Sequence, residues 1–215
     1  MPIRENVADV EARIARACAR AGRKRDDVTL VAVSKTFPAE FVDEAIEAGI
    51  AEVGENRVQE AREKKPLVRG TARWHLIGHL QTNKAKDAVK LFDVIQAIDS
   101  LDLAQKLARA AEAHGKRQEV MLQVNIGDEE QKGGCPIGQV GELIEAVQAS
   151  LLPLAGLMAI PPLGVEPAPY FALLAKLARR HDVVGLSIGM SKDFEAAVML
   201  GATAVRVGTA LFEDP

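Results

Sequence analysis

The chain has 215 residues, of which 48% are hydrophobic, 27% charged and 4% aromatic, and its formal net charge is −3. This composition is ordinary for a globular protein, and the length suits one domain that spans residues 1–215. The basic residues are scattered, so the sequence carries no footprint of nucleic-acid binding. No apolar run approaches the roughly eighteen residues that a membrane span needs, and the charged N-terminal segment lacks an apolar signal core. We therefore expect a cytoplasmic protein.

The first segment has the pattern of an amphipathic helix, which Gly22 is placed to end. After it, strand-like apolar runs alternate with helical patterns. The sequence predicts strands at 29–34, 52–54, 74–77, 94–97, 120–125, 154–158, 185–188 and 204–207. It predicts helices between them at 39–48, 57–65, 83–91, 101–114, 138–149, 169–181 and 192–200.

This alternation predicts an α/β fold with a parallel sheet. Most of the strand runs are continuously apolar, which is typical of strands buried on both faces. Eight strand–helix units in about 200 residues fit a closed (β/α)8 TIM barrel, with a doubly wound open sheet as the alternative. Only the segment "TALFEDP" follows the eighth strand, so the last outer helix is missing or one turn long. We expect the extra N-terminal helix to cover that gap.

Polar residues and glycines collect at the carboxyl ends of the predicted strands. In a TIM barrel these ends meet at one face, where ligands bind. The residues are Lys35, Glu55, Asn56, Gly78, His79, Asn125, Met158, Gly189, Met190, Ser191, Gly208 and Thr209. The sequence therefore predicts a ligand site at this face of the barrel.

Lys35 ends an apolar strand, where an amine has two common uses. It can pair with an anion, or it can act as a nucleophile toward aldehydes when its surroundings lower its pKa. A lysine that only reaches the rim of the barrel is the alternative interpretation.

Two small-residue turns follow the seventh and eighth strands. Ser191, after Gly189, is placed to cap the next helix, and Gly208 forms the second turn. TIM barrels bind phosphate at the loops after these strands, although such glycines can also serve only to close tight turns. Arg206 lies within the last apolar strand, where a buried charge needs a carboxylate or a heterocyclic ring nitrogen as a partner. A phosphate site, an aldehyde-accepting lysine and a donor to a ring nitrogen together describe a site for pyridoxal 5′-phosphate (PLP).

The sequence resembles the PLP homeostasis protein family, whose barrel is similar to the N-terminal domain of alanine racemases. The resemblance extends in order from Leu30 to Phe212. It is carried by "LVAVSKT", "EVGENRVQE", "WHLIGHLQTNK", "LQVN", "GLMAI" and "LSIGMSKDFEAAVMLGATAVRVGTALF". The chain departs from the family pattern at His79, where a proline is expected, and in the loop around Cys135.

The resemblance implies a role for each predicted site residue. Lys35 should hold PLP covalently as an internal aldimine, a Schiff base. Ser191, Gly208 and Thr209 should hold the phosphate together with the backbone of Met190, and Arg206 should approach the pyridine nitrogen. Asn56 should lie near the oxygen side of the ring, with Ser187, Met158 and His79 as further candidates for ring contacts.

Several other residues have structural interpretations. Glu55 is placed to cap the helix that follows it, and His75 reads as a hydrogen-bonded core residue. Cys18 lies on the apolar stripe of the first helix, whereas Cys135 lies in a loop with no neighbouring base to activate its thiol, and no disulfide is expected. Lys84, Lys86 and Lys90 fit a solvated helix face, although they could also bind a phosphorylated partner.

A PLP site does not by itself make an enzyme, because chemistry on amino acids also needs a positioned acid–base group. Related racemases draw such a group from a separate C-terminal domain, and Tyr170 is predicted on an outer helix. We therefore expect a non-catalytic PLP-binding protein that acts in PLP homeostasis. We expect it to be a monomer and to deliver PLP to PLP-dependent apo-enzymes. The alternatives are a PLP-dependent racemase or lyase of small amino acids and an aldolase that uses Lys35 without a cofactor.

Overall fold

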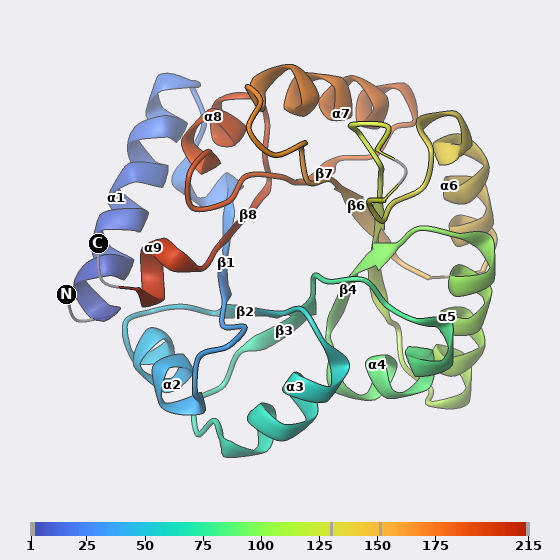
Figure 1. The fold of residues 1–215 in the computed structure, drawn as a ribbon, viewed down its shortest axis with the longest axis horizontal. Helices are drawn as coiled ribbons and strands as arrows, with labels where there is room; N and C mark the ends of the chain where they lie inside the picture. Colours follow the sequence, from blue (N-terminus) through green and yellow to red (C-terminus); the bar gives the residue numbers. More distant parts are fainter. Residues whose placement is uncertain (1–2, 130, 151, 214–215) are drawn as a thin grey trace.

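Eight parallel strands form a closed barrel in chain order (Figure 1). The computed structural model describes residues 3–129, 131–150 and 152–213. The strands are β1 (Thr29–Val33), β2 (Glu52–Glu55), β3 (Arg73–Leu76), β4 (Val94–Ile98), β5 (Glu119–Gln123), β6 (Leu154–Met158), β7 (Gly185–Ser187) and β8 (Ala204–Val207). Pairing of β1 with β8 closes the barrel, which confirms the predicted fold class and shows that the open-sheet alternative is wrong.

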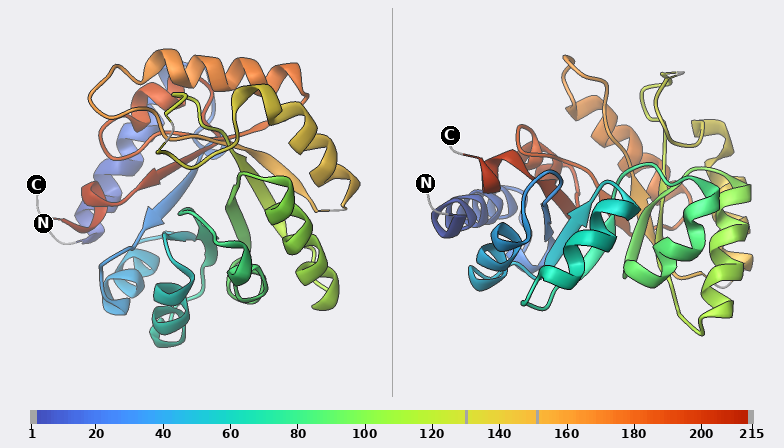
Figure 2. Two further views of the ribbon diagram at one scale, coloured as in Figure 1. Left: turned by 45° about the vertical axis from the view of Figure 1, so that its right-hand side comes forward. Right: turned by 60° about the horizontal axis from the view of Figure 1, so that its bottom comes forward.

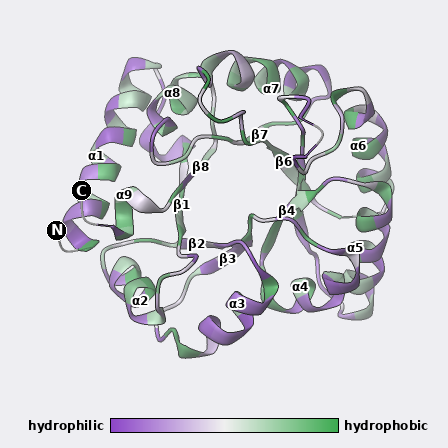
Figure 3. Ribbon diagram, viewed as in Figure 1, coloured by the Kyte–Doolittle hydropathy of each residue, from purple (hydrophilic) through white to green (hydrophobic). Residues whose placement is uncertain are grey.

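Helices surround the barrel on its outer side (Figure 1). They are α1 (Ile3–Arg20), α2 (Ala39–Glu47), α3 (Val58–Lys64), α4 (Ala85–Leu91), α5 (Leu101–Ala113), α6 (Val140–Ala149), α7 (Ala168–Arg180), α8 (Phe194–Met199) and α9 (Thr209–Phe212). Four short 3₁₀ turns occur at Arg25–Asp27, Lys65–Leu67, Thr82–Lys84 and Ile137–Gln139. The helix ribbons alternate between hydrophobic and hydrophilic residues along their length (Figure 3), as expected of helices with one face on the strands.

The outer layer is completed from both ends of the chain. The helix after β8, α9, is a single turn, and α1 lies against both α8 and α9 (Figure 2). The side-chain amide of Asn6 donates a hydrogen bond of 3.0 Å to the carbonyl of Leu211. The N-terminal helix therefore covers the gap left by the short last helix, as the sequence predicts.

The strands are buried on both faces, which accounts for their continuous apolar sequences. All five residues of β4 are buried, and so are the three of β7. Strands β6 and β7 approach closely, since a Cβ on Gly185 would lie 1.9 Å from the carbonyl oxygen of Ala155. Glycine is thus required at this position by the close packing of the two strands.

The predicted element boundaries differ from the structure by at most two residues. The predicted strand 120–125 ends at Gln123, because Val124 and Asn125 pair instead with the loop at Cys135. The helix predicted from residue 192 begins at Phe194. In the described part of the chain, no helix is long and apolar enough to cross a membrane, and no cluster of three or more His, Cys, Asp or Glu residues is arranged to hold a metal ion.

Candidate ligand site

A cavity of about 930 Å³ opens at the carboxyl ends of the strands. Its wall includes eight of the ten residues that the family resemblance implies for PLP binding, and these eight come from five strand–helix units of the barrel. They are Lys35, Asn56, His79, Met190, Ser191, Arg206, Gly208 and Thr209. The proline-rich loop 160–167 between β6 and α7 forms another part of the wall. The structure thus brings together residues that lie up to 174 positions apart in the sequence.

Lys35 is an exposed residue, and the buried Ser34 separates it from Val33, the last residue of β1. The following residue, Thr36, has a φ of +68°, a left-handed conformation that turns the chain sharply before α2. The amines of Lys64 and Lys65 donate to backbone carbonyls. Within the described ranges, the amine of Lys35 has no such acceptor, and its side chain lines the cavity. The amine is therefore free to react with a ligand.

A buried ion pair supports the backbone at this point. The fully buried Glu55 accepts hydrogen bonds from Lys64 and from the hydroxyl of Ser34, the latter at 2.6 Å. Lys64 also donates to the carbonyl of Ser34 at 2.6 Å. Burial raises the pKa of the Glu55 carboxyl, and the hydrogen bonds from Lys64 and Ser34 partly offset that rise. The interpretation of Glu55 as a helix cap is wrong, because α3 begins three residues later, at Val58, and Glu55 points into this cluster instead.

The two glycine turns after β7 and β8 lie side by side. The hydroxyl of Ser191 accepts hydrogen bonds from the backbone nitrogens of Gly208 and Ala210, both at 3.3 Å. Ser191 is not the cap predicted for α8; that position is held by Asp193, whose carboxylate accepts from the nitrogen of Met190 at 2.6 Å. Closure of the barrel brings the two turns together, and the serine connects them.

The two turns are closely packed, and at Gly189 the backbone requires glycine. Gly189 has a φ of +91°, and a Cβ there would lie 2.6 Å from the Cβ of Ala197. Gly208 packs on β1, where a Cβ would lie 3.2 Å from the carbonyl oxygen of Val33. Phe37 and Phe212 also pack together, with ring centroids 5.1 Å apart. The loop that carries Lys35 is therefore fixed against the turn at Gly208.

Arg206 is a buried cation at the floor of the cavity. Its Nη1 donates to the carbonyl and to the hydroxyl of Ser187, at 2.6 and 2.7 Å, and its Nη2 donates to the carbonyl of Ala159 at 3.0 Å. Burial lowers the pKa of this guanidinium to about 10, and the negative charge of Asp193 partly opposes the shift. A guanidinium carries five N–H hydrogens. The Nε–H and the second Nη2 hydrogen have no acceptor among the residues that the structure describes.

Two predicted ring contacts lie outside the cavity wall. Met158 is fully buried in β6, and Ser187 lies behind Arg206 as its hydrogen-bond partner. Their direct contact with a ligand stays a prediction. Tyr170 lies on α7 and does not line the cavity.

His79 and Asn56 line the cavity from the loops after β3 and β2. The Nδ1 of His79 lies 3.4 Å from a carboxylate oxygen of Asp99, and its side chain is 64% exposed. Gly78 permits the close approach of two loops here, since a Cβ would lie 2.3 Å from the carbonyl oxygen of Asn56. The departure from the family pattern at His79 thus places an ionisable ring at the mouth of the cavity.

The cysteines and the surface lysines match their structural interpretations. Cys18 and Cys135 are both buried, free thiols. Burial, together with the charge of Asp99, raises the pKa of the Cys135 thiol to about 12, so it is not a reactive nucleophile. The lysines predicted to form a solvated face, Lys84, Lys86 and Lys90, are all exposed.

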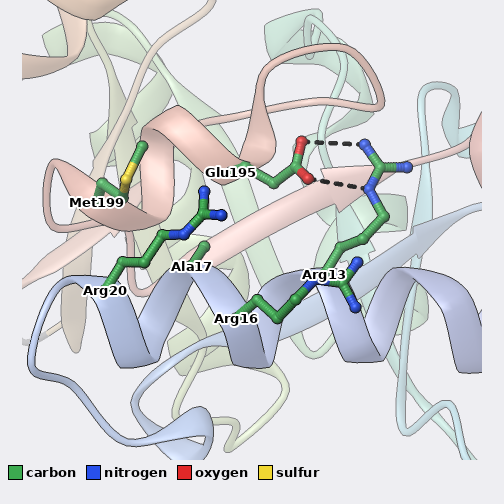
Figure 4. Close-up of a pocket in the computed structure, with 6 residues that line it drawn as sticks. All are labelled: Arg13, Arg16, Ala17, Arg20, Glu195 and Met199. Atoms are coloured by element: carbon green, nitrogen blue, oxygen red, sulfur yellow. Dashed lines mark hydrogen bonds and ion pairs between the residues drawn. The ribbon is translucent and has the colours of Figure 1, made fainter.

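A second, smaller hollow of about 80 Å³ lies between α1 and α8 (Figure 4). Arg13 donates two parallel hydrogen bonds of 3.0 Å to the carboxylate of Glu195. These bonds lower the pKa of the Glu195 carboxyl. Because Glu195 also lines the main cavity, this ion pair connects the N-terminal helix to the wall of the site.

Sequence reasoning missed several residues of the site. Lys64, Gln123, Lys192 and Asp193 either support or line the cavity. Lys192 could have been found from its place next to Ser191 in the predicted turn. Lys64 and Gln123 carry no local signal, since only the closed barrel brings them to the site.

The family model for the alanine racemase N-terminal domain matches residues 6–214. The chain is 43% identical to the pyridoxal phosphate homeostasis protein of Pseudomonas aeruginosa, over 98% of this chain and 94% of that protein. It is 40% identical to the protein of the same name from Escherichia coli strain K12, over 98% of this chain and 95% of that one. The chain belongs to the pyridoxal phosphate homeostasis protein family.

A solved structure of the same type shows what one such protein binds. PipY of Synechococcus elongatus, in a solved structure with PLP bound, is 38% identical to this chain and superposes with a TM-score of 0.78. The match covers 93% of this chain and 99% of PipY. These comparisons confirm the predicted barrel and the family resemblance that the sequence motifs indicated.

Proposed function

We propose that this chain is a PLP-binding protein of intracellular PLP homeostasis, with residues 1–215 forming one PLP-binding barrel in the cytoplasm. It captures PLP on Lys35, keeps the free aldehyde at a low concentration and supplies PLP to apo-enzymes that need it. The observation that carries the proposal is that Lys35 shares one cavity with the glycine turns and with Arg206. The PLP-bound relative and the names of the homologues support it.

The residues of the cavity fit the parts of PLP. The aldehyde of PLP condenses with a primary amine, which Lys35 offers without a competing acceptor within the described ranges. The dianionic phosphate fits the Ser191 hydroxyl, whose oxygen accepts from the backbone nitrogens of Gly208 and Ala210 and whose hydrogen is left for an anion. Gly208 and Thr209 line the cavity beside it. The pyridine nitrogen is an acceptor without a hydrogen when it is unprotonated, and it fits the unused N–H hydrogens of Arg206.

We propose that the protein holds PLP without catalytic turnover. Catalysis on amino acids depends on the ring as an electron sink, and a cationic arginine at the ring nitrogen disfavours the protonated ring. The cavity wall does contain His79, which could serve as an acid–base group, so a racemase or lyase acting on small amino acids is the competing function. Incubation of the PLP-loaded protein with alanine or serine in D₂O tests this point. Rapid, stereospecific exchange of the Cα hydrogen would overturn the non-catalytic role.

The site of attachment is tested by borohydride reduction of the PLP-loaded protein, followed by intact mass measurement and peptide mapping. The modified peptide should contain Lys35. Lys192 lines the same cavity and provides a matched control. Lys35→Met should abolish the added mass, whereas Lys192→Met should retain it. Attachment to Lys192, or to surface lysines alone, would contradict the proposal.

The anion site is tested separately from the amine. Lys35→Ala should lose the covalent bond but still bind PLP through the turns at Ser191 and Gly208. Equilibrium dialysis with PLP measures this residual binding, and inorganic phosphate should compete with it. Complete loss of PLP binding by this variant would show that the anion site is wrongly assigned.

A further inference from the structure

A continuous row of polar side chains crosses the interior of the barrel from the cavity to its opposite end. It starts at Arg206 on β8 and passes through Ser187 on β7, Gln96 on β4 and His75 on β3 to Glu52, the first residue of β2. The first three contacts measure 2.7, 2.6 and 2.9 Å. Ser187, Gln96, His75 and Arg206 are all buried. We call these five residues the interior network.

The chemistry of the two ends sets the direction of every hydrogen bond. The carboxylate of Glu52 can only accept, so the Nε2 of His75 carries the hydrogen. The Nδ1 of the neutral ring is then an acceptor, and the Gln96 amide nitrogen donates to it. The remaining oxygen of Gln96 accepts from the hydroxyl of Ser187, at 2.6 Å.

The other end of the interior network agrees with this direction. Arg206 can only donate, and the Ser187 oxygen receives its Nη1 hydrogen. All donors therefore point from the buried cation toward the carboxylate of Glu52. Glu52 in turn faces Arg73, which also binds Glu119 at 2.8 Å on the outside of the barrel.

Stability alone does not account for this arrangement. The interior of a TIM barrel is ordinarily filled by branched apolar side chains. Buried polar groups must all find partners, and replacing them by apolar residues of similar volume often costs nothing. Hydrogen bonds connect all five residues without a gap. Of the five, Arg206 lines the cavity, so we infer that the network serves the position of Arg206.

Resting on the function proposed above, we propose that Ser187, Gln96, His75 and Glu52 position Arg206 for the ring-nitrogen end of PLP. Ser187 occupies both Nη1 hydrogens, so the Nε–H and one Nη2 hydrogen remain for the ligand. The interior network fixes the rotation of the guanidinium and directs the Nε2 hydrogen of His75 toward Glu52. His75 and Glu52 thus act on the ring without lining the cavity.

The first test uses the wild-type protein without PLP. Nitrogen-15 NMR of the histidine rings should show His75 as the neutral Nε2–H tautomer, with its hydrogen protected from exchange by burial. A doubly protonated ring or the Nδ1–H tautomer would overturn the proposed direction. Because this readout needs no ligand, its result is independent of whether the proposed function is correct.

The second test uses variants loaded with PLP. His75→Phe and Gln96→Met break the interior network, and each should shift the absorbance maximum of bound PLP and weaken its retention about tenfold, the effect of one or two hydrogen bonds. His75→Gln has an amide that can accept from Gln96 and donate to Glu52, so it should restore part of the wild-type spectrum. Attachment to Lys35 should persist in all three variants.

Ile98→Val is the matched control, since Ile98 is buried on the same strand as Gln96 and does not line the cavity. It should lose about as much thermal stability as the network-breaking variants but leave the absorbance spectrum of bound PLP unchanged. An unchanged spectrum in both network-breaking variants, or an equal shift in Ile98→Val, would overturn the positioning role. If one breaking variant fails to fold, the other gives the same comparison. Failure of the wild-type protein to attach PLP would instead contradict the proposed function.

Discussion

Lys64 donates a hydrogen bond of 2.6 Å to the backbone carbonyl of Ser34, the residue that directly precedes Lys35. The same amine pairs with the fully buried Glu55. The backbone next to Lys35 is therefore held by a second lysine, which is the last residue of α3. Lys64 neutralises a carboxylate that would otherwise be buried without a cation.

Lys64→Met should destabilise the protein by about 3 kcal/mol, because it leaves Glu55 buried and unpaired. Urea unfolding monitored by circular dichroism measures the change. The double variant Lys64→Met/Glu55→Gln should recover part of the loss, since the glutamine carries no charge. Equal stabilities of the wild-type and Lys64→Met proteins would show that the pair does not support this loop.

Ser191→Ala should weaken binding of PLP but not of pyridoxal, which lacks the phosphate. The hydroxyl links its own turn after β7 to the turn at Gly208, and we place the anion between these two turns. Loss of a hydrogen bond to a charged group weakens binding about tenfold or more. Titration of the two ligands against the Lys35→Ala background separates anion binding from the covalent step. An equal loss for both ligands would place the phosphate elsewhere.

Arg206→Glu should allow the ring nitrogen to protonate and should shift the absorbance of bound PLP. Among the described residues, this guanidinium is the only cation buried at the floor of the cavity. A carboxylate in its place would stabilise the protonated, positively charged ring nitrogen. Absorbance spectra across pH 6–9, recorded for wild type and variant, give the comparison. Identical spectra would place Arg206 away from the ring.

Asp43 should contribute stability that depends on pH. Its carboxylate accepts from the backbone nitrogens of Gly70 and Arg69, at 2.9 and 2.8 Å. The bond from Gly70 is the main cause that lowers the pKa of Asp43 below its ordinary value of 3.8, with a further contribution from Arg69. The stabilisation is therefore fully present above pH 3.8 and is lost as the pH falls through the lower pKa of the folded state.

Asp43→Asn should accordingly lower Tm by about 2–4 °C near pH 7, and this difference should narrow as the pH falls below about 4. Scanning calorimetry of both proteins at several pH values measures it. Asp182→Asn removes the same charge from an exposed residue with a φ of +54°, which asparagine tolerates, and should change Tm little at any of these pH values. A Tm difference for Asp43→Asn that stays constant with pH would contradict the assignment.

Cys135 should resist thiol reagents in the folded protein at pH 8. It is buried, and its pKa is raised to about 12, so almost no thiolate is present. Labelling with a chromogenic disulfide should proceed only after denaturation. The exposed variant Thr71→Cys provides the positive control and should react at once. Rapid labelling of Cys135 in the native protein would show that its loop opens readily.

The architecture was largely predictable from local patterns. Continuous apolar runs mark strands buried on both faces, and all eight were placed correctly because this signal lies within a few neighbouring residues. Lys35 and Gly208 were identified as candidates in the same way, by their place after such a run. The predicted helix caps were wrong where a side chain bonds to a distant residue instead of the local helix end. Ser191 contacts Gly208, and Glu55 pairs with Lys64.

The sequence by itself determined the order of strands and helices and which residue types stand at the strand ends, because hydrophobic periodicity and turn chemistry act locally. Closure of the barrel decided the rest. Ser187 and Gln96 are 91 positions apart, and Arg206 meets Ala159 across 47. Such contacts depend on how β4, β6, β7 and β8 are placed around the barrel, and no window of neighbouring residues encodes that placement.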